Sequence, residues 1–468
     1  MDIIVQKFGG TSVADEKRRR RVIEHIRRAL GEGFRVVAVV SAMGRRGDPY
    51  ATDTLLDLVG GERTLLPPRE RDLLLSTGEI ISAAVLAQAL WEAGIPNTVL
   101  TGGQAGIVTT DHFTRAEIVG LRPERVRDVL ALGHVAVVAG FQGQSADGEI
   151  TTLGRGGSDT TAAALGVALE ARAIEIFTDV DGVMTADPRI APEARPIRTM
   201  TYVEVANFAY LGAKVIHPRA VELAMQKNIP IRVRGTMSAD AGTLIAAPAL
   251  SGAAAVRERV VTGIAQTPGV TQIRVEVDGV DPMLPMAVFG AMAENGISVD
   301  LINVFPRGVV YTVRAADAPR AQALLEAKGF RPAVTPGCAK VSVIGAGMAG
   351  RPGVMATIVS ALTAAGIEIL QSADSHTTIW VLVREDKMAE AVRVLHRAFR
   401  LGEGDEAGGG PSGAEGVRSS GRPAAERAAF ADLSGARPGA GAQAAIDTGK
   451  AGVHHAVSKA HHGDGHAV

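Results

Sequence analysis

Hydrophobic residues in the first half of the chain follow two alternating spacings. Short runs rich in Val and Ile, such as residues 3–8, 35–42 and 173–180, end at turn or polar residues, as buried strands do. Helical patterns lie between these runs. In residues 15–30, Val and Ile recur every three to four positions on one face, and the arginines lie mostly on the other. This alternation predicts an α/β sandwich over residues 1–245.

A weak internal repeat follows in the second half of the chain. Residues 287–302 and 357–372 match at an offset of 70 residues, and each segment is followed by a strand-like run and a helical run. Such a repeat indicates two copies of one supersecondary unit. We therefore predict two βαββαβ modules, in residues 260–335 and 336–402.

The remaining segments differ in composition. Residues 246–259 show no clear hydrophobic period and are predicted to be a linker. Residues 403–468 are rich in Gly, Ala, Ser and Arg and cannot bury a core, so we predict a disordered tail.

Composition excludes several classes of protein. A length of 468 residues predicts two or three domains, and 46% hydrophobic residues are enough for sizeable cores. A net charge of -1 provides no basic field for nucleic acid and no polybasic membrane anchor. The single cysteine, Cys338, excludes an intramolecular disulfide and a multi-cysteine metal site. The start does not read as a signal peptide and no apolar run approaches about 20 residues, so we expect a cytoplasmic protein without a membrane span.

One glycine motif suggests a dinucleotide site. Gly345-x-Gly347-x-x-Gly350 follows an apolar run, and Glu368 lies where a ribose-binding acid would belong. A doubly wound fold, however, needs two βαβαβ halves, and only about 57 residues run from Gly345 to Leu401. We interpret these glycines as turn residues.

The first stretch with stronger chemical meaning is VQKFGGTSVAD. It places Lys7 at a strand end, followed by Gly9 and Gly10 and by a helix that starts near Asp15. Glycines let a backbone approach a phosphate closely, and a helix N-terminus offers free N–H groups. The residues alone leave two interpretations open: a phosphate site, or a strand-to-helix turn with an exposed lysine.

The second stretch is TTLGRGGSDTTAAAL. Glycines surround Arg155, and Ser158 and Asp159 are expected at the N-cap of an Ala-rich helix. A guanidinium in this position can bind a carboxylate through two hydrogen bonds while backbone N–H groups hold an anion. We favour an anion site over a simple helix cap.

The third stretch is FTDVDGVMTADPR. Its Asp179-x-Asp181-Gly182 spacing faintly suggests a calcium loop, but the glycine comes too early and position twelve is Ile190, so we expect no metal site. A polar turn at the carboxyl end of a strand can still hold a nucleotide.

Together with SAMG (residues 41–44) and LLLSTGE (residues 73–79), these stretches closely resemble the bacterial aspartate kinases of the amino-acid kinase family, from Met1 to about Leu401. The resemblance implies an amino-acid kinase three-layer sandwich followed by two ferredoxin-like ACT domains. In this family one ACT domain is interrupted by the other, so residues 260–266 are expected to pair with residues after Lys340. The chain is most similar to the monofunctional, diaminopimelate-sensitive branch.

The resemblance also implies the reaction and the partners. The γ-phosphoryl group of ATP, with Mg²⁺, would pass to the β-carboxylate of L-aspartate, giving 4-phospho-L-aspartate and ADP. This is the first step towards diaminopimelate and lysine, threonine and methionine. A regulatory amino acid (diaminopimelate, lysine or threonine) would bind the ACT domains, and a homodimer or larger homo-oligomer would form through them. Nucleic acid and membrane partners are not expected.

The resemblance assigns roles residue by residue. The catalytic residues would be Lys7 and Asp159, with Asp159 orienting Lys7 or the substrate amine. The ATP-binding set is Lys7, Phe8, Gly9, Gly10, Ser41, Thr178, Asp179, Thr185, Asp187, Arg189 and Lys214. The aspartate-binding set is Ser41, Thr52, Glu79, Arg155, Gly156, Gly157, Ser158 and Asp159, with Arg155 on the α-carboxylate and Glu79 on the α-amino group. The effector-binding set is Ser298, Val299, Asp300, Ser375 and His376.

Two other functions remain open from the sequence. A related kinase would act on glutamate or N-acetylglutamate, which the arginine of GRGGSD and the ACT pair argue against. A catalytically silent amino-acid sensor would keep the fold without the activity, which the intact Lys7, Arg155 and Asp159 argue against.

Overall fold

The computed structural model describes residues 1–212, 215–247, 260–346, 348 and 350–403. Most of the predicted linker, almost all of the predicted tail, Lys214 and Gly347 lie outside the described residues.

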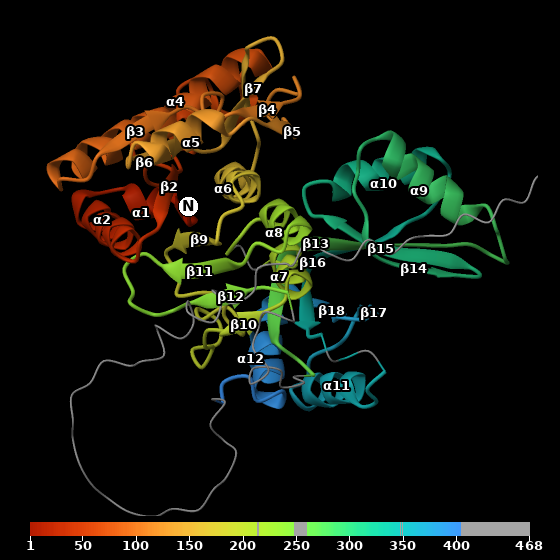
Figure 1. Ribbon diagram of the computed structural model, residues 1–468. Helices are drawn as coiled ribbons and strands as arrows, with labels where there is room; N and C mark the ends of the chain where they lie inside the picture. The colour runs from red at the N-terminus through yellow and green to blue at the C-terminus, as the bar shows by residue number, and fades with distance from the viewer. Residues whose placement is uncertain (213–214, 248–259, 347, 349, 404–468) are drawn as a thin grey trace, which may run out of the picture. The chain divides into compact units, whose positions relative to one another are not determined.

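An eight-stranded sheet organises residues 1–247 (Figure 1), in the order β10-β12-β11-β9-β1-β2-β6-β3. The strands from β11 to β3 are parallel, and β12 is antiparallel to β11. Strand order reverses beside β1, and ligands of such sheets bind outside the carboxyl ends of the strands at that point. The strands are β1 (Ile3–Phe8), β2 (Arg35–Val40), β3 (Asn97–Leu100), β6 (Val135–Ala139), β9 (Ala173–Thr178), β10 (Thr199–Met200), β11 (Ile231–Gly235) and β12 (Thr243–Ile245).

Helices cover both faces of this sheet, which confirms the predicted three-layer sandwich. Because side chains alternate between the faces of a strand, Val37 and Val39 join one core while Val36 and Val40 join the other. The first core contains residues of α5 (Glu124–Ala131), α6 (Gly157–Ala168), α7 (Tyr202–Tyr210) and α8 (Pro218–Gln226), and the second contains residues of α2 (Glu16–Gly31) and α4 (Pro68–Glu92).

Several elements were not predicted from the sequence. A four-stranded sheet has the order β5-β4-β7-β8. Its strands are three or four residues long, too short to show a clear hydrophobic period. The elements are β4 (Ile107–Thr109), β5 (Ile118–Leu121), β7 (Gln142–Ser145), β8 (Ile150–Thr152), the short helices α1 (Gly10–Val13) and α3 (Thr52–Asp57), and the 3₁₀ turn η1 (Gly61–Arg63).

Helix α4 qualifies the expectation that no apolar segment is long enough to cross a membrane. Among the described residues it is the one helix with the length and apolar composition for that purpose. Half of its most apolar window is buried in the protein, and Leu86 and Leu90 belong to the core of the sandwich. These features are typical of a core helix.

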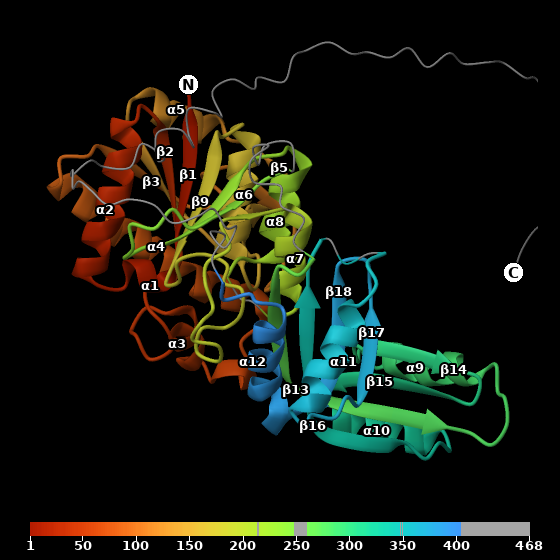
Figure 2. The same cartoon turned by 90° about the horizontal axis from the view of Figure 1, so that it is seen from below.

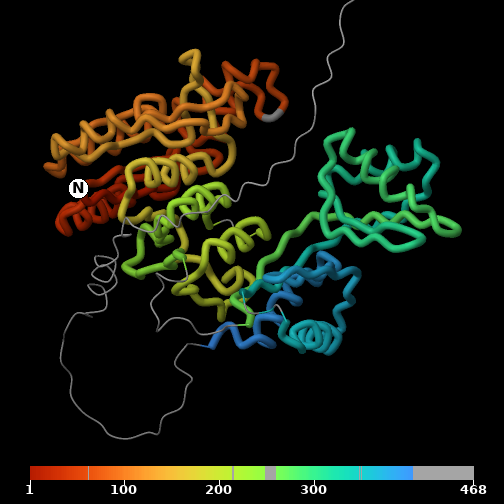
Figure 3. The backbone as a smooth tube through the Cα atoms, turned by 45° about the vertical axis from the view of Figure 1, so that its right-hand side comes forward, coloured from red at the N-terminus to blue at the C-terminus, as the bar shows by residue number. Residues whose placement is uncertain are grey.

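A six-stranded antiparallel sheet organises residues 260–403, in the order β14-β15-β13-β16-β18-β17 (Figure 2). Its elements form two βαββαβ modules, which the backbone trace separates (Figure 3). They are β13 (Gly263–Glu276), α9 (Leu284–Glu294), β14 (Asp300–Phe305), β15 (Gly308–Arg314), α10 (Ala318–Ala327), β16 (Ala333–Ile344), α11 (Val354–Ala364), β17 (Gln371–Asp374), β18 (Thr378–Arg384), the 3₁₀ turn η3 (Glu385–Lys387) and α12 (Met388–Ala398).

The two modules share their long strands. Residues 263–267 of β13 pair with residues 340–344 of β16, as predicted for residues 260–266, whereas residues 270–274 pair with residues 333–338. Each long strand therefore serves both modules, and a division between residues 335 and 336 falls within β16. Each module keeps its own hydrophobic core.

The glycine motif of residues 345–350 follows β16 in this sheet. The neighbours of β16 are β13 and β18, and both are antiparallel to it. A dinucleotide fold requires parallel strands at this place. Gly350 (φ +71°) adopts a left-handed conformation in the turn before α11, as expected of a turn residue, whereas Gly347 lies outside the described residues.

Candidate active site

The turn after β1 brings the backbone close to its neighbours. The N–H of Gly9 donates to the carbonyl of Phe177 at 3.2 Å. A Cβ atom on Gly10 would lie 2.5 Å from the carbonyl oxygen of Ala42, so no larger residue fits. Phe8 is buried and stacks on Phe177, with ring centroids 4.9 Å apart. The buried side chain of Phe8 is therefore not available to ATP, and a contact of this residue with the nucleotide would involve its backbone.

Lys7 connects this turn to the second glycine-rich stretch. Its Nζ lies 2.8 Å from Oδ1 of Asp159, and both side chains are about nine-tenths buried. The other oxygen of Asp159 accepts a hydrogen bond of 3.1 Å from the N–H of His217. Asp159 therefore holds the lysine at the carboxyl end of β1.

The Arg155 loop ends in a sharp turn. Gly156 has φ +70°, and a Cβ atom there would lie 2.1 Å from Cγ of His217. Arg155 is exposed, and α6 starts at Gly157. The expected N-cap at Ser158 and Asp159 was wrong, because the left-handed Gly156 is the cap and both residues lie buried in the first turn. Arg155 thus directly precedes the turn at which α6 begins, and a helix N-terminus is a favourable place for an anion.

Glu79 is a buried carboxyl group beside the SAMG segment. Its Oε1 accepts a 3.0 Å hydrogen bond from the N–H of Ala42, and Oε2 has no partner within the described part of the chain. Burial raises the pKa of Glu79 to about 8. The group is therefore largely protonated at neutral pH until a cation joins it.

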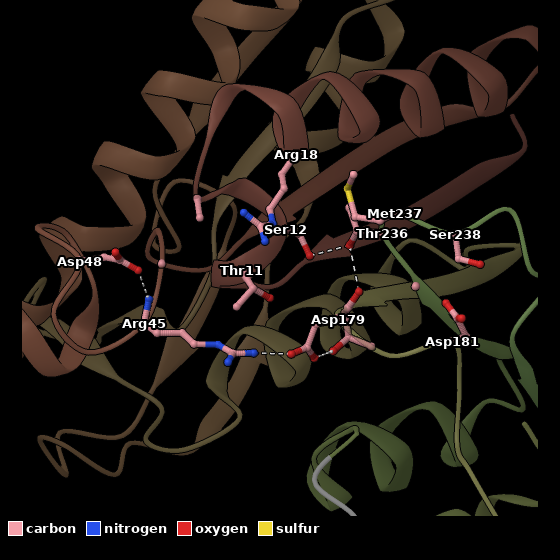
Figure 4. Close-up of a pocket in the computed structure, with 14 residues that line it drawn as sticks. Thr11, Ser12, Arg18, Arg45, Asp48, Asp179, Asp181, Thr236, Met237 and Ser238 are labelled. Carbon is pink, nitrogen blue, oxygen red and sulfur yellow. Dashed lines mark hydrogen bonds and ion pairs between the residues drawn. The ribbon is translucent and has the colours of Figure 1, made fainter. Parts of the chain in front are cut away.

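A cavity of about 770 Å³ lies beyond the carboxyl ends of β9 and β11 (Figure 4). Thr178 and Asp179, both predicted to contact ATP, line it, and Asp179 forms an ion pair with Arg45. Ser12 and Thr236 are joined across its wall by a 2.6 Å hydrogen bond. Neither Arg45 nor Thr236 was predicted as a site residue, because Arg45 follows the SAMG segment without belonging to it and Thr236 lies in no motif.

The other residues predicted to contact ATP lie on the loop that follows. Thr185 is fully buried, and its hydroxyl is 2.9 Å from Nε2 of His396. Asp187 pairs with Arg189 at 2.7 Å and also accepts a hydrogen bond from Gln266. The structure therefore does not place these three side chains among those that line the cavity.

The remaining predicted residues lie apart. Thr52 is half-buried at the start of α3. Asp300 of the first module forms an ion pair with Lys340 of β16, whereas Ser375 and His376 are exposed after β17. Gln371, which sequence analysis did not identify, donates to Oδ1 of Asn303 at 2.7 Å and so links β17 to β14.

Known protein families match both parts of this chain. A model of the amino acid kinase family matches residues 2–235, and one of the ACT domain matches residues 333–397. Aspartokinase 1 of Bacillus subtilis is 54% identical over 402 residues, which cover 86% of this chain and all of the relative. The chain belongs to the aspartokinase family.

Other aspartokinases agree with this assignment. The enzyme of Mycolicibacterium smegmatis is 42% identical, with 87% of this chain and 98% of the relative covered. Among solved structures, Escherichia coli aspartokinase III in complex with aspartate and ADP is 26% identical, with a TM-score of 0.67 over 85% of this chain and 99% of that chain. The aspartate kinase of Clostridium acetobutylicum has the same fold, with a TM-score of 0.70, 23% identity and coverage of 85% and 100%.

Proposed function

We propose that this chain transfers the γ-phosphoryl group of ATP to the β-carboxylate of L-aspartate. The observation that carries the proposal is the 2.8 Å contact between Lys7 and Asp159, which joins the Gly9–Gly10 turn to the Arg155 loop. One turn then holds the phosphates and the other the amino acid. Membership of the aspartokinase family supports the same reaction.

Electrostatics determines what the site must do. The β-carboxylate is ionised at neutral pH, because its ordinary pKa is about 4, so the reaction requires no general base. Two unit charges 4 Å apart repel by about 4 kcal/mol at an effective dielectric of 20. The Lys7 ammonium and the backbone N–H groups that follow Gly9 at the start of α1 offset this repulsion and stabilise charge on the transferring oxygens.

The amino acid is recognised by opposite charges. Arg155 binds the α-carboxylate and Glu79 the α-amino group, with Ser41, Thr52 and the start of α6 completing the pocket. The nucleotide rests near Thr178 and Asp179. Mg²⁺ enters with ATP, whose phosphates supply ligands for it. Thr185, Asp187, Arg189 and Lys214 remain predictions for the nucleotide.

The ACT modules supply regulation in this proposal. An end-product amino acid binds near residues 298–300 and 375–376 and favours a less active state of the kinase. Diaminopimelate is the first candidate, followed by lysine and threonine. Escherichia coli aspartokinase III has been solved with lysine and aspartate, which supports effector control by such a ligand. We also propose a cytoplasmic homo-oligomer assembled through the ACT modules.

Trapping of the acyl phosphate with hydroxylamine tests this function. Incubation with MgATP and L-aspartate is expected to give a hydroxamate, whereas L-glutamate and N-acetylglutamate give little. Preference for either alternative acceptor would identify a different kinase of the family. No turnover with any acceptor would identify a silent sensor.

A further inference from the structure

Asp72, near the start of α4, is a buried carboxylate that the proposed reaction does not use. Its side chain is fully buried. The N–H of Thr114 donates to both of its oxygens, at 3.0 and 2.9 Å. The N–H and the hydroxyl of Thr152 donate to it at 2.7 and 2.6 Å. One carboxylate thus ties together two segments that lie 42 and 80 residues away in the sequence.

Both segments flank the loop that carries Arg155. Thr152 ends β8, three residues before Arg155. The carbonyl oxygen of Thr114 lies 3.2 Å from the position that a Cβ atom on Gly154 would occupy. The N–H of Ala116 donates to the carbonyl of Thr152 at 2.9 Å, so the two segments are also joined directly.

The backbone at Thr114 needs this support. Thr114 has φ +69°, a left-handed conformation that a β-branched residue adopts rarely and at a cost. Such strain persists only where the surroundings hold the residue in place, and strained residues cluster at functional sites. The hydrogen bonds from the Thr114 N–H to Asp72 supply that restraint.

Helix α4 links this restraint to the other end of the amino-acid pocket. Asp72 and Glu79 are seven residues apart, which is two helical turns, so they lie on one face of α4. Burial raises the pKa of Asp72, while the hydrogen bonds from Thr114 and Thr152 lower it.

We propose that Asp72 is a positioning residue for L-aspartate. It fixes the loop of residues 152–157, and hence the Arg155 guanidinium, relative to Glu79 on the same helix. Arg155 and Glu79, which bind the α-carboxylate and the α-amino group of the substrate, are then held at a fixed distance from each other. This inference rests on the proposed role of Arg155.

The first test replaces the carboxylate by its neutral isostere. In Asp72→Asn, the amide NH₂ faces an N–H or a hydroxyl donor, and the loop loses its restraint. We expect the KM for aspartate to rise about tenfold or more, while the KM for ATP and kcat change less than about threefold. Glu70→Gln is the matched control, because Glu70 is a half-buried carboxylate of the same helix that pairs with Arg69 on the surface. This variant is expected to leave both KM values unchanged.

Thr152→Val keeps the test valid where Asp72→Asn fails to fold. It removes the hydroxyl donor and leaves the N–H donor, so the KM for aspartate is expected to rise in the same direction by about three- to fivefold. A merely structural role of Asp72 predicts a different result: the melting temperature falls, and the KM values for ATP and aspartate change together or not at all. That result overturns the inference.

A double-mutant cycle with Arg155→Met shows whether Asp72 acts through Arg155. If it does, adding Asp72→Asn, or Thr152→Val in its place, to Arg155→Met raises the KM for aspartate no further. Effects that multiply overturn the inference and leave the role of Arg155 intact. If Arg155→Met alone leaves the KM for aspartate unchanged, the proposed role of Arg155 is wrong, and the inference falls with it. Aspartate binding by calorimetry provides a second readout.

Discussion

At the scale of single residues, the two charged groups of the proposed site differ in their partners. Lys7 lies 2.8 Å from the carboxylate of Asp159 at the end of β1. Burial raises the pKa of Glu79 to about 8, although its carboxyl group accepts a hydrogen bond from the neutral N–H of Ala42. Lys7 is thus prepared for phosphate before any ligand arrives, whereas Glu79 becomes fully charged only when an ammonium group binds beside it.

Lys7→Ala tests the first of these roles. The variant loses the cation that stabilises the transferring phosphoryl group, so we expect kcat to fall by about a hundredfold or more and the KM for aspartate to change far less. Steady-state hydroxamate assays measure both quantities. Lys17→Ala, which removes an exposed lysine of α2, is the control. An unchanged kcat in Lys7→Ala would reject the assignment.

Glu79 predicts a pH dependence of substrate binding. The pKa of about 8 leaves Glu79 mostly neutral below that pH, and the ammonium of aspartate binds the ionised form. The KM for aspartate is therefore expected to fall as pH rises from 6 to 8, by up to about tenfold per unit. In Glu79→Gln this dependence should disappear, and the KM should be high throughout. A wild-type KM that is independent of pH would contradict the role of Glu79.

At the scale of elements, the site is built where strands end in glycine turns. Gly10 and Gly156 allow two backbone segments to approach their neighbours more closely than any other residue permits. Lys7 and Asp159 extend from these turns and meet between them. The geometry of the site therefore depends on close contacts at two glycines, which a residue with a side chain could not make.

Gly156→Ala tests that dependence. Its φ of +70° disfavours a Cβ atom, and the atom would lie 2.1 Å from Cγ of His217, whose N–H donates to Asp159. We expect a loss of about 1–3 kcal/mol in unfolding free energy and a marked loss of kcat/KM for aspartate. Thermal melts and kinetics check both. Gly33→Ala has a similar φ of +90° with open space around it, so it controls for backbone strain alone. Equal activity in the two variants would show that the contact with His217 is irrelevant.

The sequence allowed prediction of those elements that show a clear hydrophobic period. Residues 3–8 form a strand with the expected bounds, and the strands expected at 35–42 and 173–180 end two residues earlier. Short runs of Val and Ile bounded by polar residues leave few alternatives to a strand. Helix α4 was not predicted, because its own apolar residues are spread over all of its faces and form no distinct hydrophobic stripe. The four-stranded sheet of β4, β5, β7 and β8 was not predicted because its strands are three or four residues long.

The limits of prediction at the site have a similar origin. Lys7, Arg155 and Asp159 lie in glycine-rich motifs whose chemistry is local, so their importance can be deduced from neighbouring residues. The proposed role of Asp72 depends on its contacts with Thr114 and Thr152, which are distant in the sequence, and no local pattern indicates those contacts. The same reason explains why the buried position of Thr185 was not foreseen.

At the scale of the whole molecule, polar contacts join the kinase sandwich to the second ACT module. The hydroxyl of Thr262 donates to Glu204 at 2.8 Å, and Asn207 donates to Thr377 at the same distance. Thr185 and His396, both buried, form a third contact of 2.9 Å. Thr185 lies seven residues after Thr178, which lines the cavity, so these contacts connect the module to the proposed nucleotide site.

His396→Leu tests whether this connection transmits regulation. The variant removes the contact between His396 and the buried Thr185 hydroxyl, which still accepts a hydrogen bond from the N–H of Arg195. The loss costs about 1 kcal/mol and loosens the loop between the cavity and α12. With the amino acid that inhibits the wild type most strongly, we expect the half-inhibitory concentration to shift at least about threefold, because coupling between sites depends on such contacts. His134→Leu is the matched control, since it breaks a 3.0 Å contact with Thr98 inside the sandwich. If both variants keep the wild-type inhibition curve while His396→Leu alone is destabilised, the contact holds the two parts together without transmitting the effector signal.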